Sequence, residues 1–305
     1  MILFGALLIP AVSSEIVLDQ NQLQIWIPDY LSQTKFYLSY RQIEFIEPRA
    51  FNGLKQMQEL FLSGNMLTSL DGFLFLGLIQ LERLLLDSNK LDYLNVFLFR
   101  GLSNLKELYL FKNKLISLDS SLFYGLNHLE RLYLNENEIS SLDSYLFKDL
   151  DLLKELHLDY NQLTFLNDST FNDLLELEVL NLSNNKLTKL DAGLFDALGH
   201  LKELFLSKNS LSYLDSSLFS KLVQLEVLEL YFNDITSINS IIFSKTKRLK
   251  ILDLFGNKLN SIERGAFIGL FYLENVILGD NPISLILPSY VKRLCSTNPF
   301  CIVYS

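Results

Sequence analysis

The chain has 305 residues, of which 49% are hydrophobic and 20% are charged, so it can bury a core and is not a disordered tail. Lysine and arginine total 26 against 35 aspartates and glutamates, a formal net charge of −9, which argues against a nucleic-acid partner because such binding needs a basic surface. Two cysteines cannot form a zinc site alone, and no cofactor motif is present, so neither a metal nor a cofactor is expected.

The N-terminal residues 1–14 are expected to be a secretory signal peptide. Residues 1–12 are apolar, and the small residues Ala11 and Ser13 have the spacing that signal peptidase prefers, just before Glu15. A buried first strand is the alternative. No later stretch reaches the ~18 uninterrupted apolar residues of a membrane span. We therefore expect a secreted or cell-surface protein without a transmembrane segment.

A repeat of 24 residues organises most of the chain. Around each repeated asparagine the sequence reads L-x-x-L-x-L-x-x-N-x-L-x-x-L, as from Leu105 to Leu118. A phenylalanine column with the same period runs from Phe51 to Phe267. The asparagine column consists of Asn65, Asn89, Asn113, Asn137, Asn161, Asn185, Asn209, Asn233, Asn257 and Asn281.

This pattern resembles the extracellular, 24-residue class of leucine-rich repeat proteins, such as toll-like receptors, slit-like guidance proteins and small matrix proteoglycans. Arg41 takes the asparagine position of the first repeat, so we expect eleven repeats in residues 33–284. The fold class is then α/β: a curved solenoid, or horseshoe, with a concave parallel β-sheet and an irregular or short-helical convex side. The resemblance implies recognition of other molecules rather than catalysis.

The positions within a repeat have simple physical roles. Leu108 and Leu110 alternate with outward residues, which predicts a short strand with leucines inside, and neighbouring repeats must stack to bury them. Phenylalanines fill the wider side, so the stack is expected to curve around the sheet. Each asparagine amide can satisfy turn backbone groups, and the resemblance implies an asparagine ladder.

Two further columns have predicted structural roles. An Asp or Asn column that includes Asp71 and Asn95 is expected to cap backbone N–H groups where each convex turn begins. On the strands, Arg83, Glu107 and Arg131 belong to a column of alternating charge, which predicts cross-strand ion pairs.

Both ends depart from the family pattern. Residues 15–32 resemble an N-terminal capping segment without its usual cysteines, and we expect Ile16, Ile25 and Trp26 to cover the open end. Residues 285–305 are expected to be a degenerate C-terminal cap. Its Cys295 and Cys301 are predicted to form a disulfide bond in a secreted chain.

The outward strand positions are the candidate binding site, on the concave face. Aromatic side chains there are not needed for folding and act as anchors in protein interfaces, although aromatic residues also favour strands for their own sake. Asp87, Glu107 and Asp159 are expected to form an exposed acidic rim around the central rings, which favours a basic protein ligand. The candidate ligand-binding residues are Phe61, Leu85, Asp87, Glu107, Tyr109, Phe111, Tyr133, His157, Asp159, Phe205, Tyr231 and Phe255.

Two other functions are alternatives to protein binding. His157, Asp159 and Ser183 are the components of a hydrolase triad, but a stiff sheet offers no oxyanion hole, so an enzyme is not expected. A matrix or adhesion component that self-associates, for example as a homodimer, is the alternative hypothesis. Asn167 and Asn181 each begin an N-x-S sequence and are glycosylation candidates in a eukaryotic secretory route.

Overall fold

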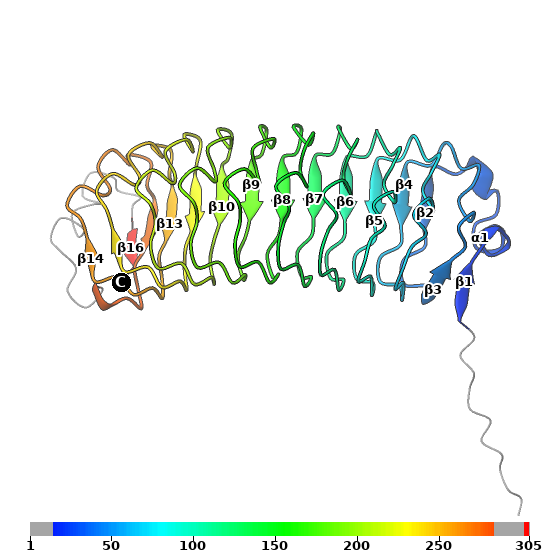
Figure 1. Cartoon of the computed structure of the whole chain (residues 1–305), viewed down its shortest axis with the longest axis horizontal. Coiled ribbons are helices and arrows are strands. Elements are labelled where there is room, and N and C mark those ends of the chain that lie inside the picture. Colours follow the sequence, from blue (N-terminus) through cyan, green and yellow to red (C-terminus); the bar gives the residue numbers. More distant parts are fainter. Residues whose placement is uncertain (1–14, 284–301, 305) are drawn as a thin grey trace, which may run out of the picture.

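The computed structural model describes residues 15–283 and 302–304. They form an elongated coil in which a 12-stranded parallel sheet runs from end to end (Figure 1). Each of the eleven repeats supplies one strand of this sheet, and the twelfth strand comes from the C-terminal segment. The strands are, in spatial order, β2 (Lys35–Tyr37), β4 (Glu59–Phe61), β5 (Arg83–Leu85), β6 (Glu107–Tyr109), β7 (Arg131–Tyr133), β8 (Glu155–His157), β9 (Val179–Asn181), β10 (Glu203–Phe205), β11 (Val227–Glu229), β13 (Ile251–Asp253), β15 (Asn275–Ile277) and β16 (Ile302–Tyr304).

The remaining elements lie outside the main sheet. At the N-terminal end they are β1 (Ile16–Leu18), α1 (Gln20–Trp26), the 3-10 helix η1 (Tyr30–Ser32) and β3 (Ile43–Ile46), which pairs with β1 in parallel. Near the other end, β12 (Ser237–Ile238) and β14 (Ser261–Ile262) form a short parallel pair. The backbone between these elements consists mostly of turns, so the expected irregular convex side and the eleven-repeat solenoid are confirmed.

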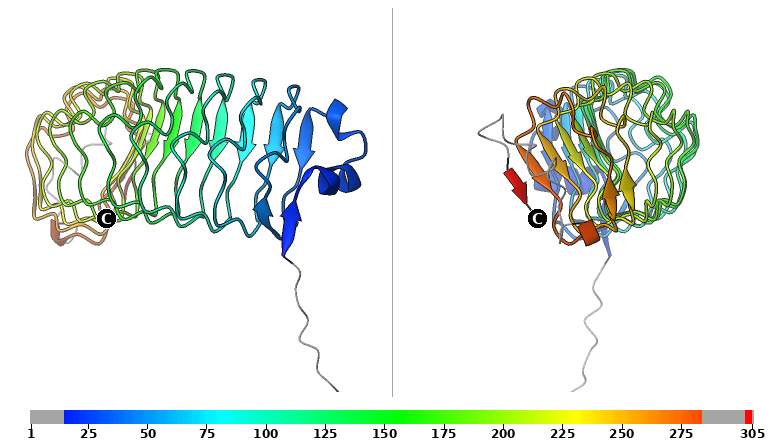
Figure 2. Two further views of the ribbon diagram at one scale, coloured as in Figure 1. Left: turned by 45° about the vertical axis from the view of Figure 1, so that its right-hand side comes forward. Right: turned by 90° about the vertical axis from the view of Figure 1, so that its left-hand side faces the viewer.

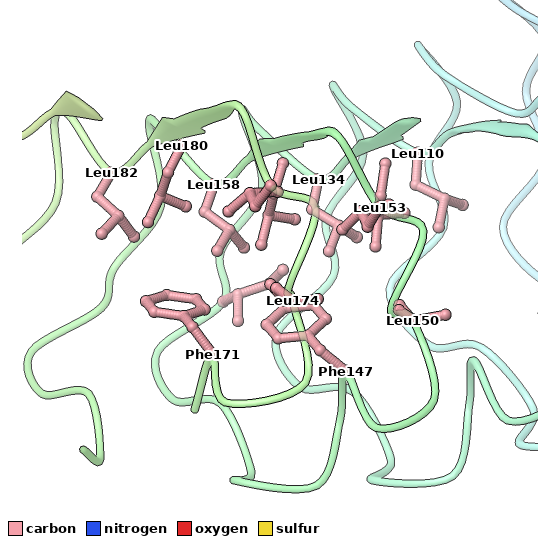
Figure 3. Close-up of a cluster of buried hydrophobic side chains, with 14 of the residues drawn as sticks. Leu110, Leu134, Phe147, Leu150, Leu153, Leu158, Phe171, Leu174, Leu180 and Leu182 are labelled. Carbon is pink, nitrogen blue, oxygen red and sulfur yellow. The ribbon is translucent and has the colours of Figure 1, made fainter. Parts of the chain in front are cut away.

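Each strand pairs with the next in a register of 24 residues. Leu84 lies opposite Leu108, and Leu108 lies opposite Leu132. These central leucines are fully buried, and the two residues that flank each of them are partly exposed. Figure 3 shows the result, with leucines from successive repeats stacked beneath the strands and Phe147 and Phe171 below them. One repeat could not bury this set, so the core exists only through stacking.

The spacing of side chains on the two sides of the coil explains its curvature. Along the buried phenylalanine column, the ring centroids of Phe99 and Phe123 are 6.2 Å apart, and those of Phe123 and Phe147 are 6.5 Å apart. On the sheet side, the rings of Tyr109 and Tyr133 are only 4.6 Å apart. Because the phenylalanine side is wider for each repeat, the stack bends with the sheet on its inner side (Figure 2). The predicted concave sheet is confirmed.

The asparagine ladder connects each turn to the preceding repeat. Asn137 Nδ2 donates hydrogen bonds to the carbonyl oxygens of Leu134 (3.1 Å) and Leu110 (3.0 Å), and its Oδ1 accepts one from the amide of Leu115 (3.1 Å). The same three kinds of bond recur from Asn89 onward, with only small changes in length. The ladder predicted from the spacing is confirmed, and each member is buried.

The capping column is confirmed at every member except Asp191, whose side chain caps no backbone N–H group within the described residues. Asp71 Oδ1 accepts a hydrogen bond from the amide of Phe73 (2.9 Å), and Asn95 Oδ1 accepts one from the amide of Phe97 (3.0 Å). Equivalent bonds follow at Asp119, Asp143, Asn167, Asp215 and Asn239. These side chains therefore fix the entry to the convex turns that they begin.

The N-terminal cap covers the core differently from the expectation. Leu18 and Leu23 are fully buried, and Ile16 and Trp26 pack against the core as predicted. Ile25 was expected to cover the end, but 71% of it is exposed, because it lies on the opposite face of the short α1 from Leu23. The predicted signal peptide, residues 1–14, and the predicted pair Cys295 and Cys301 lie outside the described residues.

The ladder generates a first prediction. Asn137→Ala leaves the buried amide of Leu115 without a partner and removes one of the two ladder hydrogen bonds that the carbonyls of Leu110 and Leu134 each accept, so we expect it to lower the free energy of unfolding by about 1–3 kcal/mol. Arg41→Ala should cost less, because the Arg41 backbone amide is satisfied by Asn65 and its own side chain supplies no ladder amide. Urea denaturation of both variants measures the difference, and equal losses would contradict this role of the ladder.

Candidate functional site

The outward residues of the sheet form two regular rows, which together we call the sheet face. The first row contains the first residue of each strand, and the second row contains the third residue. The second row begins Tyr37, Phe61, Leu85, Tyr109, Tyr133 and His157, and continues with Asn181, Phe205, Glu229 and Asp253. The other candidate residues, Asp87, Phe111, Asp159, Tyr231 and Phe255, lie two positions beyond the strand ends.

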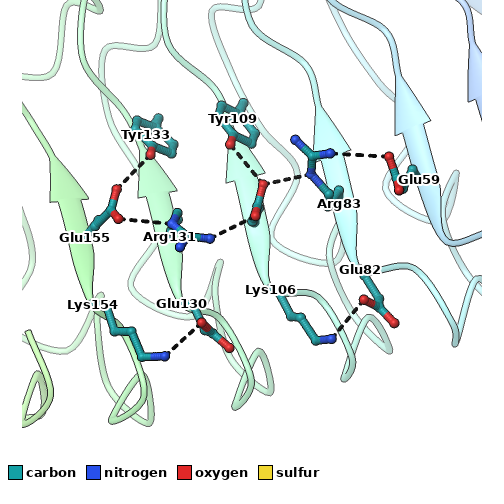
Figure 4. A network of polar contacts seen from close by, with 11 residues as sticks. Glu59, Glu82, Arg83, Lys106, Tyr109, Glu130, Arg131, Tyr133, Lys154 and Glu155 are labelled. Atoms are coloured by element: carbon teal, nitrogen blue, oxygen red, sulfur yellow. Dashed lines mark hydrogen bonds and ion pairs between the residues drawn. The ribbon is translucent and has the colours of Figure 1, made fainter.

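The first row carries a continuous ladder of ion pairs from β2 to β8, and Figure 4 shows the part from Glu59 to Glu155. Arg131 bridges Glu107 (2.9 Å) and Glu155 (3.0 Å), and Arg83 bridges Glu59 (3.3 Å) and Glu107 (2.8 Å). Lys35 completes the series through a 2.7 Å contact with Glu59. The predicted alternation is thereby confirmed, although each exposed rung contributes only a few tenths of a kcal/mol. A second, separate set of pairs, such as Lys106 with Glu82, follows the next column.

Beside this ladder, four rings form a cluster that we call the tyrosine patch: Tyr109, Phe111, Tyr133 and His157. The ring of Tyr133 stacks on Tyr109 with centroids 4.6 Å apart and on His157 at 4.8 Å, and Phe111 meets Tyr109 edge-on at 6.4 Å. All four side chains are partly exposed. The structure thus brings together the residues that the sequence placed at the centre of the candidate site.

The ion-pair ladder also orients the rings of the tyrosine patch. Tyr109 Oη donates to Glu107 Oε2 (2.9 Å), and Tyr133 Oη donates to Glu155 Oε2 (2.9 Å). Burial by itself would raise the pKa of Glu107, but the hydrogen bonds from Tyr109 and Arg83 hold this pKa below its usual value. Burial and the hydrogen bond to Glu155 raise the pKa of Tyr133. Glu107 therefore stays ionised, and the phenols stay protonated and fixed in orientation.

Two of the predicted acidic rim residues do not lie on the rim. Asp87 is only 7% exposed, and its Oδ1 accepts a hydrogen bond of 2.6 Å from Ser63 Oγ. Asp159 is only 9% exposed, and its buried Oδ1 has no hydrogen-bond partner. The expectation of an exposed acidic rim is therefore wrong for both, because Asp87 turns toward Ser63 of the preceding repeat and the carboxyl of Asp159 is buried. Glu107 is exposed in part but is already paired with two arginines.

Asp159 has an unusual electrostatic environment. Its burial raises the pKa of its carboxyl from 3.8 to about 6, and the negative charge of Glu136 adds to this effect. The nearby His157 has a lowered pKa because it is also buried, so it is neutral near pH 7. His157 Nδ1 lies 3.9 Å from Asp159 Oδ1, which is too long for a hydrogen bond. These groups are close to one another, but they lack the contacts of a hydrolase triad.

The C-terminal half of the sheet face has a second aromatic group, which we call the phenylalanine cluster: Tyr231, Phe232 and Phe255. Phe232 meets Tyr231 edge-on at 5.8 Å and Phe255 at 5.4 Å. Gly256 allows this contact, because a Cβ atom there would lie 2.4 Å from the Phe232 ring. Phe205 lies apart, between Asn181 and Glu229 in the second row.

The acids beside the phenylalanine cluster differ from those of the ladder. Burial raises the pKa values of both Glu229 and Asp253, and for Glu229 repulsion from Asp253 adds to the shift. Within residues 15–283, neither carboxylate forms an ion pair, because the first row holds Val227 and Ile251 here instead of arginine. The carboxylates available to a basic partner thus lie in this half of the sheet face rather than around the tyrosine patch.

Sequence reasoning missed one contributor to the site. Asn135 lies one repeat before Asp159 in the same column, and its buried Oδ1 also has no hydrogen-bond partner. The signal was available, since a polar residue at this position has the same place in its repeat as Asp87 and Asp159. Among the described residues, no group of three potential ligands could hold a metal ion. The same part of the chain includes no helix with the length and apolar character needed to span a bilayer.

The environment of Asp159 generates a second prediction. The native state binds this proton more tightly than the unfolded chain, so stability falls as the pH rises from about 4 to about 6 and the cost is complete above that range. Asp159→Asn removes the buried charge. We expect it to raise the free energy of unfolding at pH 8 by up to about 3 kcal/mol.

Urea denaturation at pH 8 and at pH 4 checks this prediction, because the gain should disappear at pH 4. Asp87→Asn is the matched control, since Asp87 already has its hydrogen bond from Ser63, and it should bring no gain at pH 8. A gain at Asp159 that is equal at both pH values would contradict the proposed cause.

Comparison with known proteins places this geometry in a family. The family model for the leucine rich repeat matches residues 34–91, 79–139, 103–163, 128–187, 151–211, 176–235 and 224–283. No curated protein sequence matches the chain. The chain is similar in structure to the leucine-rich repeat protein LIC12759 of Leptospira interrogans, with 27% identity and a TM-score of 0.69, covering 87% of this chain and 70% of that one.

Two other solved structures are similar at the same level. The match to TLR13, in its complex with ssRNA13, has 28% identity and a TM-score of 0.67, and covers 87% of this chain but only 45% of the TLR13 chain. The match to the leucine-rich repeat chain FLRT2, in its complex with Latrophilin 3 and Unc5D, has 25% identity and a TM-score of 0.71, and covers 85% and 82% of the two chains. The repeat match, the parallel sheet and the asparagine ladder agree: the chain belongs to the leucine-rich repeat family.

Proposed function

We propose that this chain is a non-enzymatic extracellular module that recognises a protein ligand through its sheet face, with the tyrosine patch as the main contact. The observation that carries the proposal is the stack of Tyr109, Tyr133 and His157 on the outward side of the sheet. Rigid, partly exposed aromatic side chains at the centre of a surface are the usual anchors of protein interfaces.

Comparison between repeats argues that folding does not require these rings. The strand position held by Tyr109 and Tyr133 is held by Asn181 in β9, by Glu229 in β11 and by Asp253 in β13, and all of these strands have the same pairing and burial. Strand propensity alone therefore does not account for three adjacent rings. The hydroxyls of Tyr109 and Tyr133 are held in place by hydrogen bonds to Glu107 and Glu155, which lowers the conformational entropy lost on binding.

The chemistry of the partner follows from the rest of the sheet face. The charges near the tyrosine patch neutralise one another, whereas Glu229 and Asp253 beside the phenylalanine cluster are unpaired within the described residues. A basic protein that covers both aromatic groups fits this distribution. Among similar proteins, FLRT2 is found in a protein complex and TLR13 with an RNA. The net charge of −9 favours a protein partner for this chain.

The binding proposal predicts a clear mutational pattern. The full secreted chain, used as bait in a pull-down from extracellular protein, identifies the partner, and calorimetry then measures the affinity. Tyr109→Ala or Tyr133→Ala should weaken binding by about 2 kcal/mol, with little change in melting temperature because neither ring belongs to the core. The variants Glu229→Gln and Asp253→Asn should slow association and reduce its salt dependence.

Matched controls lie on the convex side. His128 and His200 occupy equivalent exposed positions, where each Nδ1 contacts a backbone carbonyl of the preceding repeat, and their alanine variants should not alter binding. Binding that survives the Tyr109→Ala, Tyr133→Ala double variant but is lost on altering residues 285–305 would move the site to the C-terminal end. Dimers that form without any ligand, at rising concentration, would instead support a self-associating matrix component.

The extracellular part of the proposal predicts selective glycosylation. Asn167 is exposed at the entry to a convex turn, whereas Asn181 is half-buried in β9 and its Oδ1 accepts a hydrogen bond from the amide of Ser183 (3.0 Å). In a eukaryotic secretory route, Asn167 should be the better acceptor. Intact-mass measurement of secreted protein, before and after glycosidase treatment, tests this. Protein that stays in the cytosol and retains Met1 would contradict the proposed location.

A further inference from the structure

The strand β2 forms the free N-terminal edge of the main sheet (Figure 1). In the next strand, Glu59 N donates to Thr34 O (3.0 Å) and Phe61 O accepts from Leu38 N (2.9 Å), so both groups bond to the strand before them. The 24-residue period makes Lys35 N and Tyr37 O the equivalent groups of β2. In the sheet as described, no strand precedes β2, so these groups are available for an additional strand.

The side chains at this edge are the ends of the two rows described above. Lys35 pairs with Glu59 on one side, whereas the inner cations Arg83 and Arg131 each bridge two acids. Tyr37 stacks on Phe61 at 4.8 Å, and 62% of Tyr37 is exposed. An acidic residue on the outer side of Lys35 would therefore continue the alternation of charge. An aromatic residue on the outer side of Tyr37 would continue the stack of rings.

A cavity of about 440 Å³ adjoins the same edge, between the end of α1 and β2. Its walls include Trp26, Gln33, Thr34, Lys35, Tyr37 and Arg41. The guanidinium of Arg41 lies over the Trp26 ring, 5.1 Å from its centroid. The lining holds two cations and no acid, in a chain whose net charge is −9. This local charge is complementary to an acidic segment.

We propose that the free edge of β2 binds an extended segment of a partner protein, which adds as a parallel strand with an acidic residue beside Lys35 and an aromatic residue beside Tyr37. The segment reads acid, apolar residue, aromatic residue. Strand addition supplies affinity through main-chain hydrogen bonds and specificity through alternate side chains. This site is separate from the tyrosine patch, and neither proposal depends on the other.

The sheet itself contains two precedents for this kind of strand addition, one at its opposite end and one within the repeats. At its opposite end, β16 pairs with β15 in parallel, with Asn275 opposite Ile302 and Ile277 opposite Tyr304, so a short strand from outside the repeats already extends the sheet there (Figure 2). Within the repeats, the sequence Glu107-Leu108-Tyr109 has the proposed pattern and pairs on both sides. A peptide with this sequence is therefore a suitable probe for the β2 edge.

The test uses the full chain and two fluorescent nine-residue peptides. One has the sequence of residues 105–113, LKELYLFKN, and the other has lysine in place of its glutamate. Fluorescence anisotropy should show that the wild-type chain binds the glutamate peptide about threefold or more tightly than the lysine peptide, as expected for one cross-strand charge pair. For Lys35→Glu, the preference should reverse. Hydrogen exchange in residues 34–38 should slow when the glutamate peptide is added, with no such change in residues 59–61.

A second variant covers the case in which Lys35→Glu disturbs folding through repulsion from Glu59. Tyr37→Ala should weaken binding of the glutamate peptide about threefold and should leave unchanged the binding of a third peptide with alanine in place of the tyrosine. Tyr109→Ala, in the tyrosine patch, should bind all the peptides like the wild-type chain. Three results would each overturn the proposal. The first is no binding at millimolar peptide, and the second is equal affinity for the glutamate and lysine peptides in both the wild-type chain and Lys35→Glu. The third is a dimer that forms through β2 and excludes the peptide.

Discussion

One buried side-chain amide in each repeat from Asn65 onward stabilises the turn on which the whole coil depends. The asparagine at this position donates one hydrogen bond to a carbonyl of its own repeat and one to a carbonyl of the repeat before it. Its side-chain oxygen accepts a hydrogen bond from a backbone amide of the preceding turn. These bonds combine two requirements: they satisfy backbone groups that water cannot reach, and they hold adjacent repeats in a fixed register. The leucine core, the phenylalanine column and the rows of the sheet face all follow from that register.

A fixed register separates the residues required for folding from those free to vary. Leu84, Leu108 and Leu132 repeat without change because each fills the same space between two neighbours. The outward position beside them holds leucine, tyrosine, histidine, asparagine or glutamate in different repeats. Different side chains at this one position can therefore be compared within a single chain, in a backbone that stays the same. It makes the adjacent rings of the tyrosine patch and the unpaired acids near the phenylalanine cluster informative about binding.

Most of the fold, but only part of the site, could be predicted from the sequence. The strands, the ladder and the caps follow from a period of 24 residues, and the three stacked rings follow from their equal positions in adjacent repeats. The burial of Asp87 and Asp159 could not be predicted, because it depends on how a side chain beyond the strand end turns toward its neighbour. The prediction that Ile25 covers the open end was wrong for a related reason, since a helix of seven residues can present either face to the core. The column of alternating charge predicted the ion-pair ladder, and only the way in which Arg83 and Arg131 each divide their guanidinium between two acids required side-chain geometry.

The unequal spacing on the two sides of the coil has a mechanical consequence. Phenylalanine rings lie 6.2–6.5 Å apart on the outer side, whereas the tyrosine rings of the sheet face lie 4.6 Å apart. The solenoid is thus an arc whose radius is set by contacts between neighbours alone, and a small change in each contact adds up along the array. A ligand that presses against the inner surface can open or close this arc elastically, with the strain shared among all the repeats. The width of the arc would then adapt to the ligand, while the spacing of the rings within the sheet face stays nearly constant.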